Sequence, residues 1–234
     1  MIGFGPGLGM SVAHRFGREG FRVALVSRSS HRHEGYVHAL RQAGVEVAAF
    51  AADVTDPTQL RAAVEAARER FGRIDVAWYG PGGMDGPQPG DITGVGPEQA
   101  RAAFEAMVSP AIGMVGHVLP EMRERSAGAL LFAGGISSVI PLPPLGALAL
   151  SCAALRNYAL TLNAALARDG VYAGTLTVGG LIARGDIHTA VCADPALLGG
   201  AGVPATLDPD ELADTVWELQ SVRSAAEAVV PALT

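Results

Sequence analysis

The chain opens with Met1-Ile2-Gly3-Phe4-Gly5-Pro6-Gly7-Leu8-Gly9, in which two apolar residues run into four glycines separated by single residues. A helical pattern of apolar residues follows at once, at Leu8, Val12, Ala13 and Phe16. This order predicts a strand end, a glycine-rich turn and a helix start. That arrangement turns backbone N–H groups and the positive end of a helix dipole toward a phosphate. Glycines also occur in ordinary tight turns, so the rest of the chain must show whether this turn binds a phosphate.

Strand-like and helix-like stretches alternate through most of the remaining chain. The pattern predicts strands at about 21–27, 46–51, 75–79, 129–133, 172–178 and 227–231, and helices at about 8–20, 33–43, 57–71, 97–125, 148–168 and 208–220. Such alternation is typical of a doubly wound parallel sheet, with sites at the carboxyl ends of its strands. We expect one domain over 1–234. Residues 179–206 have no clear periodicity, so we interpret them as a lid-like loop.

The strand that feeds the glycine turn is unusually short. Only Met1 and Ile2 remain to build it, although a strand usually has ~5–6 residues. In a doubly wound sheet this strand is central, and a stub would leave backbone groups of its neighbours unpaired. We therefore interpret the first strand as truncated and expect that further residues precede Met1.

Composition excludes several classes of protein. The 234 residues are 49% hydrophobic and 17% charged, and their net charge of −6 argues against a nucleic-acid partner. Prolines break the longest apolar run, at 139–150, so we expect no membrane span. Two cysteines make no disulfide framework, and no signal peptide is recognisable, which favours the cytoplasm. All 17 basic residues are Arg, and the chain contains no Lys.

Motifs in matching order and spacing resemble the short-chain dehydrogenase/reductase (SDR) family over nearly the whole chain. They are Gly3-x-x-x-Gly7-x-Gly9, Asp53-Val54, Leu119-Pro120-x-Met122, Ser151-x-Ala153-Ala154-Leu155 and Glu227-Ala228-Val229-Val230-Pro231. The resemblance implies a Rossmann-like fold that binds a nicotinamide dinucleotide. Carried over residue by residue, it implies that the cofactor contacts Gly3, Gly7, Leu8, Gly9, Asp53, Val54, Gly80, Pro81 and Ile182.

The stretch Ser27-Arg28-Ser29 bears on which cofactor is bound. NAD-specific relatives carry a carboxylate after the second strand, and here that place holds no acid. An Arg can hold a 2′-phosphate through charge-assisted hydrogen bonds, and serines add donors. We therefore predict that Ser27, Arg28 and Ser29 favour NADP(H) over NAD(H). The alternative is that Arg28 and Arg32 are solvated loop residues.

The four catalytic positions of the family hold none of the family's Asn, Ser, Tyr and Lys. The motif spacing places Met107, Gly135, Leu148 and Cys152 there, and Arg184 replaces the threonine that holds the nicotinamide amide. The catalytic residues are therefore unknown. Tyr79 and Ser137 are weak candidates, because Tyr79 more simply packs under the adenosine and Ser137 more simply binds local loop amides.

Three functions remain open on this sequence. The first, which the family favours, is a divergent oxidoreductase that uses NADP(H) on a small apolar substrate without Tyr/Lys acid–base chemistry. The second is a non-redox enzyme, such as a cyclase or isomerase, that reuses the pocket. The third is a non-catalytic NADP(H)-binding sensor or partner subunit. By analogy with the family, we expect a homodimer or homotetramer formed through helices 98–125 and 148–168, and no metal.

Overall fold

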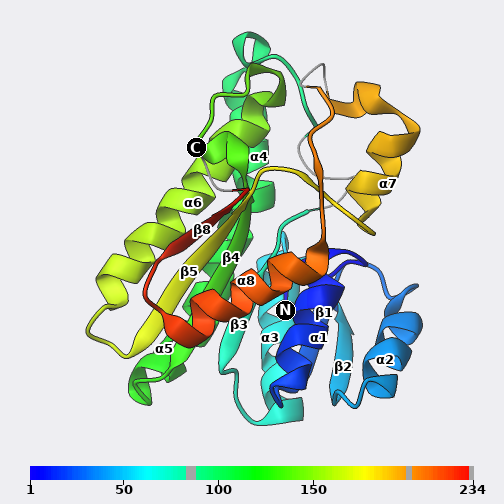
Figure 1. Ribbon diagram of the computed structural model, residues 1–234. Helices are drawn as coiled ribbons and strands as arrows, with labels where there is room; N and C mark the ends of the chain where they lie inside the picture. Colours follow the sequence, from blue (N-terminus) through cyan, green and yellow to red (C-terminus); the bar gives the residue numbers. More distant parts are fainter. Residues whose placement is uncertain (83–87, 199–201, 232–234) are drawn as a thin grey trace.

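The computed structural model describes residues 1–82, 88–198 and 202–231. A parallel sheet forms its centre (Figure 1). Four strands lie in the order β3 (Val76–Tyr79), β4 (Gly128–Gly135), β5 (Val171–Val178) and β8 (Glu227–Val230), and β1 (Val23–Ser27) pairs separately with β2 (Val47–Ala51). All these pairs are parallel, for example Val76 with Ala129 and Val23 with Val47. The predicted α/β fold with a parallel sheet is confirmed.

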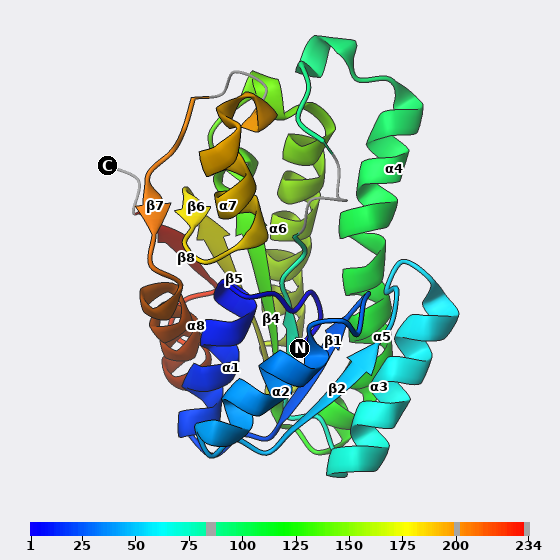
Figure 2. The ribbon, with the colours of Figure 1, turned by 90° about the vertical axis from the view of Figure 1, so that its right-hand side faces the viewer.

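Helices cover both faces of the sheet (Figures 1 and 2). One face carries α1 (Leu8–Arg18), α2 (His33–Gln42) and α8 (Pro209–Val222). The other carries α3 (Pro57–Phe71), α4 (Pro97–Met107), α5 (Ser109–Glu124) and α6 (Gly146–Leu166). Strands buried between two helical layers need apolar residues on both sides, which is why β4 reads as the unbroken apolar run Ala-Leu-Leu-Phe-Ala.

Side-chain caps fix where two of the helices begin. The Asp56 carboxylate accepts hydrogen bonds from the N–H groups of Thr58 and Gln59, and the Asp208 carboxylate accepts one from Asp210. Proline follows each cap at the first helical position, where its missing N–H costs nothing. The predicted starts of α3 and α8 are therefore confirmed.

The prediction of one long helix over 97–125 is wrong in one respect, because the structure has two helices there. α4 ends at Met107 and α5 begins at Ser109, with Val108 between them. Pro110 lies in the first turn of α5. It has no N–H to donate to the preceding turn, and its ring disfavours a continuous helix.

The segment predicted to be a lid-like loop, 179–206, contains regular secondary structure in its described residues. Strand β6 (Leu181–Ile182) pairs in parallel with β7 (Thr206–Leu207), and α7 (Asp186–Ala193) lies between them. Short 3₁₀ turns occur here at Pro195–Leu198, and elsewhere at Ile92–Gly94, Ile136–Ser138 and Pro143–Leu145. Only Val191 of α7 is buried, so the helix has no apolar stripe to reveal it. Residues 199–201 lie outside the described part.

The first strand is the stub that the sequence predicts. Ile2 makes isolated parallel bridges to Val26 of β1 and to Tyr79 of β3. Its N–H donates to the carbonyl of Trp78 at 2.8 Å, and its carbonyl accepts from Gly80 at 3.0 Å. The sheet is therefore joined at its centre by about two residues of backbone.

Two helical stretches, Pro97–Glu124 and Pro143–Leu166, are long and apolar enough to cross a membrane by length and composition alone. In this fold both pack on the sheet, and 44% and 33% of their most apolar windows are buried. Core helices of soluble proteins meet the same criterion, so the two stretches are weak evidence for a membrane.

A partly buried ion pair joins α6 to the edge strand β8 of the sheet. The Arg156 guanidinium donates two hydrogen bonds to the Glu227 carboxylate, at 2.7 and 2.6 Å, and the Thr177 hydroxyl donates a third at 2.6 Å. Burial alone would raise the pKa of Glu227, but these bonds outweigh it and the pKa lies below its ordinary value. A lowered carboxyl pKa stabilises the fold at neutral pH, and that contribution is lost as the pH falls through the folded-state pKa.

We expect Glu227→Gln to lower the free energy of unfolding by about 1–3 kcal/mol at pH 7, because the guanidinium loses a charged partner. Urea denaturation from pH 7 down to pH 3.5 measures it, and the deficit should shrink once the wild-type carboxyl is protonated. Glu98→Gln is the matched control, since the pair of Glu98 with Arg101 is exposed. A deficit for Glu227→Gln no larger than that of the control would contradict this account.

Candidate cofactor and substrate site

The glycine turn, residues 3–9, lies at the carboxyl end of the short first strand. Gly3 has φ of +75°, and a Cβ there would lie 2.0 Å from the carbonyl oxygen of Gly80. A Cβ on Gly9 would lie 3.2 Å from the Cα of Phe4. Gly3 and Gly9 thus let the turn pack against the loop after β3 and fold back on itself. Pro81 follows Gly80 and is half-buried.

The start of α1 has the donors that an anion needs. Gly7 is its N-cap, and no side chain caps the helix, in contrast to α3 and α8. The N–H groups of Met10 and Ser11 bond to the carbonyls of Gly5 and Gly7. Leu8 and Gly9, the first two helical residues, are left without a side-chain acceptor. Helix N-termini of this kind bind phosphate through backbone N–H groups and the helix dipole.

The loop after β1 gathers cationic and hydroxyl groups. Arg28 is exposed, and its charge contributes to lowering the pKa of Asp53. The Ser27 hydroxyl lies 2.8 Å from the His33 ring, and the Ser29 hydroxyl lies 2.6 Å from that of His31. The predicted serines and arginine are thus together, and the sequence analysis missed the two histidines. The histidines lie two and four residues after Ser29, and this closeness in sequence was the signal that could have placed them in the same loop.

Arg32 of the same loop reaches the segment that had been interpreted as a lid. Its Nη1 donates to both oxygens of the Asp186 carboxylate, at 2.8 Å to each. Asp186 is the first residue of α7. The loop after β1 and the helix over the site are therefore linked by one exposed ion pair, which the sequence gives no means of predicting across 154 positions.

Asp53 and Val54 follow β2, as the resemblance requires. Hydrogen bonds from the Thr55 hydroxyl, at 2.7 Å, and its N–H, at 3.0 Å, lower the pKa of Asp53 and keep it ionised at neutral pH. Both bonds reach Oδ1. Val54 packs against the core beside α3. Asp53 therefore lies just after the carboxyl end of β2.

The segment after β5 lies directly over the glycine turn. A Cβ on Gly7 would lie 3.1 Å from the Cα of Gly185. Next to it, Arg184 adopts φ of +65° and donates to the Ser11 hydroxyl at 3.2 Å. It also pairs with Asp210 at 2.8 Å. Arg184 thus joins α1, α7 and α8 around the turn, a role that its place in the sequence motif does not reveal. Ile182 lies two residues earlier, in β6.

Three of the four residues that the motif spacing predicts at the family's catalytic positions are apolar and pack against the core. Met107 and Cys152 are buried, and Leu148 is half-buried against the same cluster. Tyr79, a weak candidate for proton donor, is only 2% exposed, and its hydroxyl donates to the Met107 carbonyl at 3.0 Å. Burial raises the pKa of Tyr79 well above its ordinary value. Such a phenol is a poor acid for a substrate in the crevice.

The fourth position, Gly135, lies beside two polar side chains. A Cβ built on it would lie 3.4 Å from the Cys152 sulfur and 3.8 Å from the Ser137 hydroxyl oxygen. The Ser137 side chain and the Gly135 backbone act on the Cys152 thiol by lowering its pKa. Ser137, the other weak candidate, is half-buried at the end of β4. Within the described residues, these two are the polar side chains that the structure brings together at the family catalytic positions.

Cys152 is a poor nucleophile in this setting. Burial raises the pKa of its thiol, and the bonds to Ser137 and Gly135 only partly oppose the rise. The thiolate is the reactive form, so raising the pKa slows alkylation. Cys192 on α7 is exposed.

We expect iodoacetamide at pH 8 to alkylate Cys152 at least about 10-fold more slowly than Cys192, because its thiolate is scarce and covered. Peptide mass spectrometry over a time course measures both rates, and Cys192→Ser isolates the slow site. Equal rates would contradict this account and would make Cys152 a candidate nucleophile.

Known proteins resemble this chain in sequence and in fold. A 1-deoxy-11-beta-hydroxypentalenate dehydrogenase of Streptomyces arenae is 26% identical over 221 residues, covering 93% of this chain and 77% of the relative. An actinorhodin polyketide ketoreductase crystallised with NADPH superposes with a TM-score of 0.86 at 22% identity, covering 98% and 93% of the two chains. A metagenomic short-chain oxidoreductase in complex with NADP superposes with a TM-score of 0.76 at 20% identity, covering 100% and 96%.

The family model described as short chain dehydrogenase matches residues 1–188, which is most of the chain. That range includes the glycine turn, Asp53 and the four residues predicted at the family's catalytic positions. The sheet order and the helical layers agree with it. The chain belongs to the short-chain dehydrogenase/reductase family.

Proposed function

We propose that the chain is a single-domain, NADP(H)-binding oxidoreductase that acts on a small apolar substrate without the family's Tyr/Lys acid–base pair. The observation that carries this proposal is the uncapped start of α1 on the glycine turn, at the carboxyl edge of a parallel sheet. The backbone N–H groups of Leu8 and Gly9 would hold the pyrophosphate there. The family is one of oxidoreductases, as the dehydrogenase relative illustrates.

The loop after β1 supports NADP(H) as the preferred cofactor. It offers a guanidinium at Arg28, hydroxyls at Ser27 and Ser29, and no carboxylate between Ser27 and His33. An acid at this loop would repel a 2′-phosphate and accept the ribose hydroxyls of NAD(H) instead. Complexes of structural neighbours with NADP and NADPH agree with this assignment.

The nicotinamide would supply a hydride. The chain's residues would have to bind the substrate and supply or replace the proton donor. Met107 and Leu148 make the family catalytic positions apolar, and Leu148 cannot donate a proton. A substrate whose acceptor carbon is activated by conjugation suits such a site, because its oxygen needs no Tyr–Lys pair. Water, Ser137 or the substrate itself would then provide the proton.

The same apolar positions favour a second candidate, a non-redox enzyme such as a cyclase or isomerase. Loss of a positioned acid or base normally costs about 10²–10⁴-fold in rate, and only a reaction that needs no proton transfer from the protein avoids that cost. NADPH consumption separates the two candidates. Tight NADPH binding without oxidation across carbonyl and enone panels would favour the second, or a non-catalytic sensor.

We expect Arg28→Ala to weaken NADPH binding at least about 10-fold and to leave NADH binding nearly unchanged, since a charged hydrogen bond is worth about 1.5–3 kcal/mol. Fluorescence titration of both nucleotides measures this. Arg41→Ala, at the end of α2, is the matched control for loss of a surface charge.

Equal losses for both nucleotides would show that Arg28 does not read the phosphate. If neither nucleotide binds the wild-type protein, the cofactor assignment fails as a whole.

We also infer a homodimer or homotetramer that pairs through α4, α5 and α6, in the cytoplasm and without nucleic acid or membrane. Phe104, Ile112 and Leu150 on these helices are 41–48% exposed in the single chain. Large apolar side chains at that exposure are typical of helices that pack on a partner.

We expect Leu150→Asp to shift the protein toward monomer in light scattering after size exclusion. Val203→Asp places the same charge at an exposed valine outside these helices and should leave the mass unchanged. A wild-type protein that runs as a monomer at micromolar concentration would refute the assignment.

A further inference from the structure

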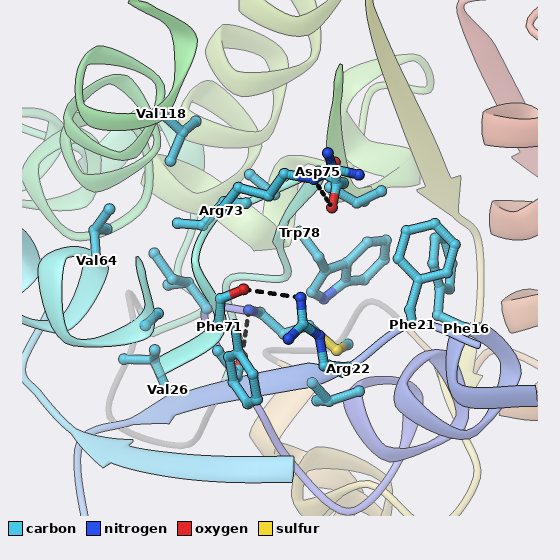
Figure 3. A pocket seen from close by; sticks show the side chains of 18 of the residues that line it. Phe16, Phe21, Arg22, Val26, Val64, Phe71, Arg73, Asp75, Trp78 and Val118 are labelled. Carbon is cyan, nitrogen blue, oxygen red and sulfur yellow. Dashed lines mark hydrogen bonds and ion pairs between the residues drawn. The ribbon is translucent and has the colours of Figure 1, made fainter. Parts of the chain in front are cut away.

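Basic residues lie at both ends of β1, in different surroundings. At the amino end, the Arg22 guanidinium lies beside a cavity of about 480 Å³ and donates to the Phe71 carbonyl at 2.8 Å (Figure 3). At the carboxyl end, the loop after β1 carries Arg28, His31 and Arg32, and all three residues are exposed. The proposed 2′-phosphate site lies at this carboxyl end, so the groups that can act on the phosphate are those of the loop.

His31 and His33 each contact one of the serines expected at the phosphate. The His31 Nδ1 lies 2.6 Å from the Ser29 hydroxyl oxygen, and the His33 Nε2 lies 2.8 Å from that of Ser27. The two imidazoles differ in exposure. His33 is the first residue of α2 and is only 9% exposed, whereas His31 is exposed. A positive charge therefore costs less at His31 than at His33.

His33 holds Ser27 as a neutral ring. Burial lowers the pKa of His33, and the charge of the nearby His31 lowers it further. The Ser27 hydroxyl donates its single proton to the Ser29 carbonyl at 3.2 Å, so the His33 Nε2–H is the donor in the contact with Ser27. His33 thus fixes the shape of the loop and is not the group that responds to pH near neutrality.

The contact between Ser29 and His31 depends on the charge of the ring. The backbone N–H of His31 donates to the Ser29 hydroxyl oxygen at 3.3 Å. A neutral ring can accept the Ser29 proton at Nδ1, and the hydroxyl then has no proton left for a phosphate. A charged ring carries a proton on both nitrogens, so Nδ1 must donate to Ser29. The Ser29 proton is then available to an anion.

The loop and the elements packed against it carry other charged or titratable groups. They are Arg28 and Arg32 of the loop, His33, Glu34 and Tyr36 of α2, Asp53 after β2 and Asp186 of α7. Arg32 donates to Asp186, and Thr55 keeps Asp53 ionised. Guanidinium groups stay charged throughout the neutral range, and carboxyl groups ordinarily ionise below it. Histidine is the side chain that changes its charge between about pH 5 and 8.

We propose that His31 makes the preference for NADP(H) over NAD(H) depend on pH, because its protonated ring frees the Ser29 hydroxyl to donate to the 2′-phosphate. The proposal rests on the proposed function, in which Ser27, Arg28 and Ser29 hold that phosphate. His31 is a positioning residue, since its ring contacts Ser29 and acts through it.

The sign of the pH dependence follows from linkage. If the protonated ring favours the phosphate, a bound phosphate favours the protonated ring by the same factor. The contribution of His31 therefore grows as the pH falls from 8 to 6.5 and is lost as the pH rises again. Arg28 supplies a contribution that does not change over this range, because a guanidinium stays charged.

The test measures binding of adenosine 2′,5′-bisphosphate and of AMP, which differ only in the 2′-phosphate, by calorimetry at pH 8 and 6.5. Both values lie above about pH 6, where a phosphate monoester takes up its second proton. We expect the ratio of the two affinities to rise about 4-fold between pH 8 and 6.5. NMR of the histidine rings should show that the bisphosphate raises the titration midpoint of His31 by about one pH unit, and that AMP does not.

Three variants test the assignment. His31→Gln keeps a polar side chain that cannot take up a proton, so the ratio should no longer rise. Ser29→Ala should also remove the rise, because His31 acts through Ser29. His38→Gln is the matched control, since His38 is an exposed histidine of α2 outside the loop, and here the ratio should rise as in the wild type.

The outcomes separate this inference from the proposed function. A ratio above one that stays constant with pH in the wild type, or that rises equally in His31→Gln, would overturn the role of His31 and leave the NADP(H) preference intact. Affinity for the bisphosphate no greater than for AMP at either pH would overturn the NADP(H) preference, and the role of His31 with it.

Discussion

The pairing of Met1 and Ile2 with two different strands holds the sheet together. Met1 bonds to β1 through Ala24 and Val26, and Ile2 bonds to β3 through Trp78 and Gly80. Everything downstream depends on these bonds, because the glycine turn starts one residue later. The carbonyl of Gly80 lies where a side chain on Gly3 would be. The contact between Gly3 and Gly80 therefore fixes the position of the turn relative to the sheet.

Around the turn, charged side chains join elements that are far apart in sequence. Arg32 links the loop after β1 to α7, and Arg184 links α1 to the start of α8. Both pairs are about half exposed, and ion pairs of that kind are typically worth less than about 1 kcal/mol. These ion pairs therefore orient the segment over the turn but hold it there only weakly. A phosphate at the loop after β1 would attract the same guanidinium that now holds Asp186.

The residues at the predicted catalytic positions have a structural role. Met107 and Cys152 are part of the core cluster that also buries Tyr79. A Lys in place of Cys152 would be a charge in that cluster, and buried charges are costly unless paired. At the positions that the motif spacing predicts to be catalytic, Met107, Leu148 and Cys152 contribute packing to the core.

The sequence by itself determined the alternation of strands and helices, the glycine turn, the missing carboxylate after β1 and the short first strand. These are local signals, carried by periodicity, proline and glycine positions and residue type. Tertiary structure alone decided the rest: the break at Val108, the helix within 179–206, the pairing of Arg32 with Asp186, and the burial of Tyr79. Some of these features join residues that are distant in the chain, and others depend on a single buried side chain such as Val191. Neither kind produces a periodic pattern of apolar residues in the sequence.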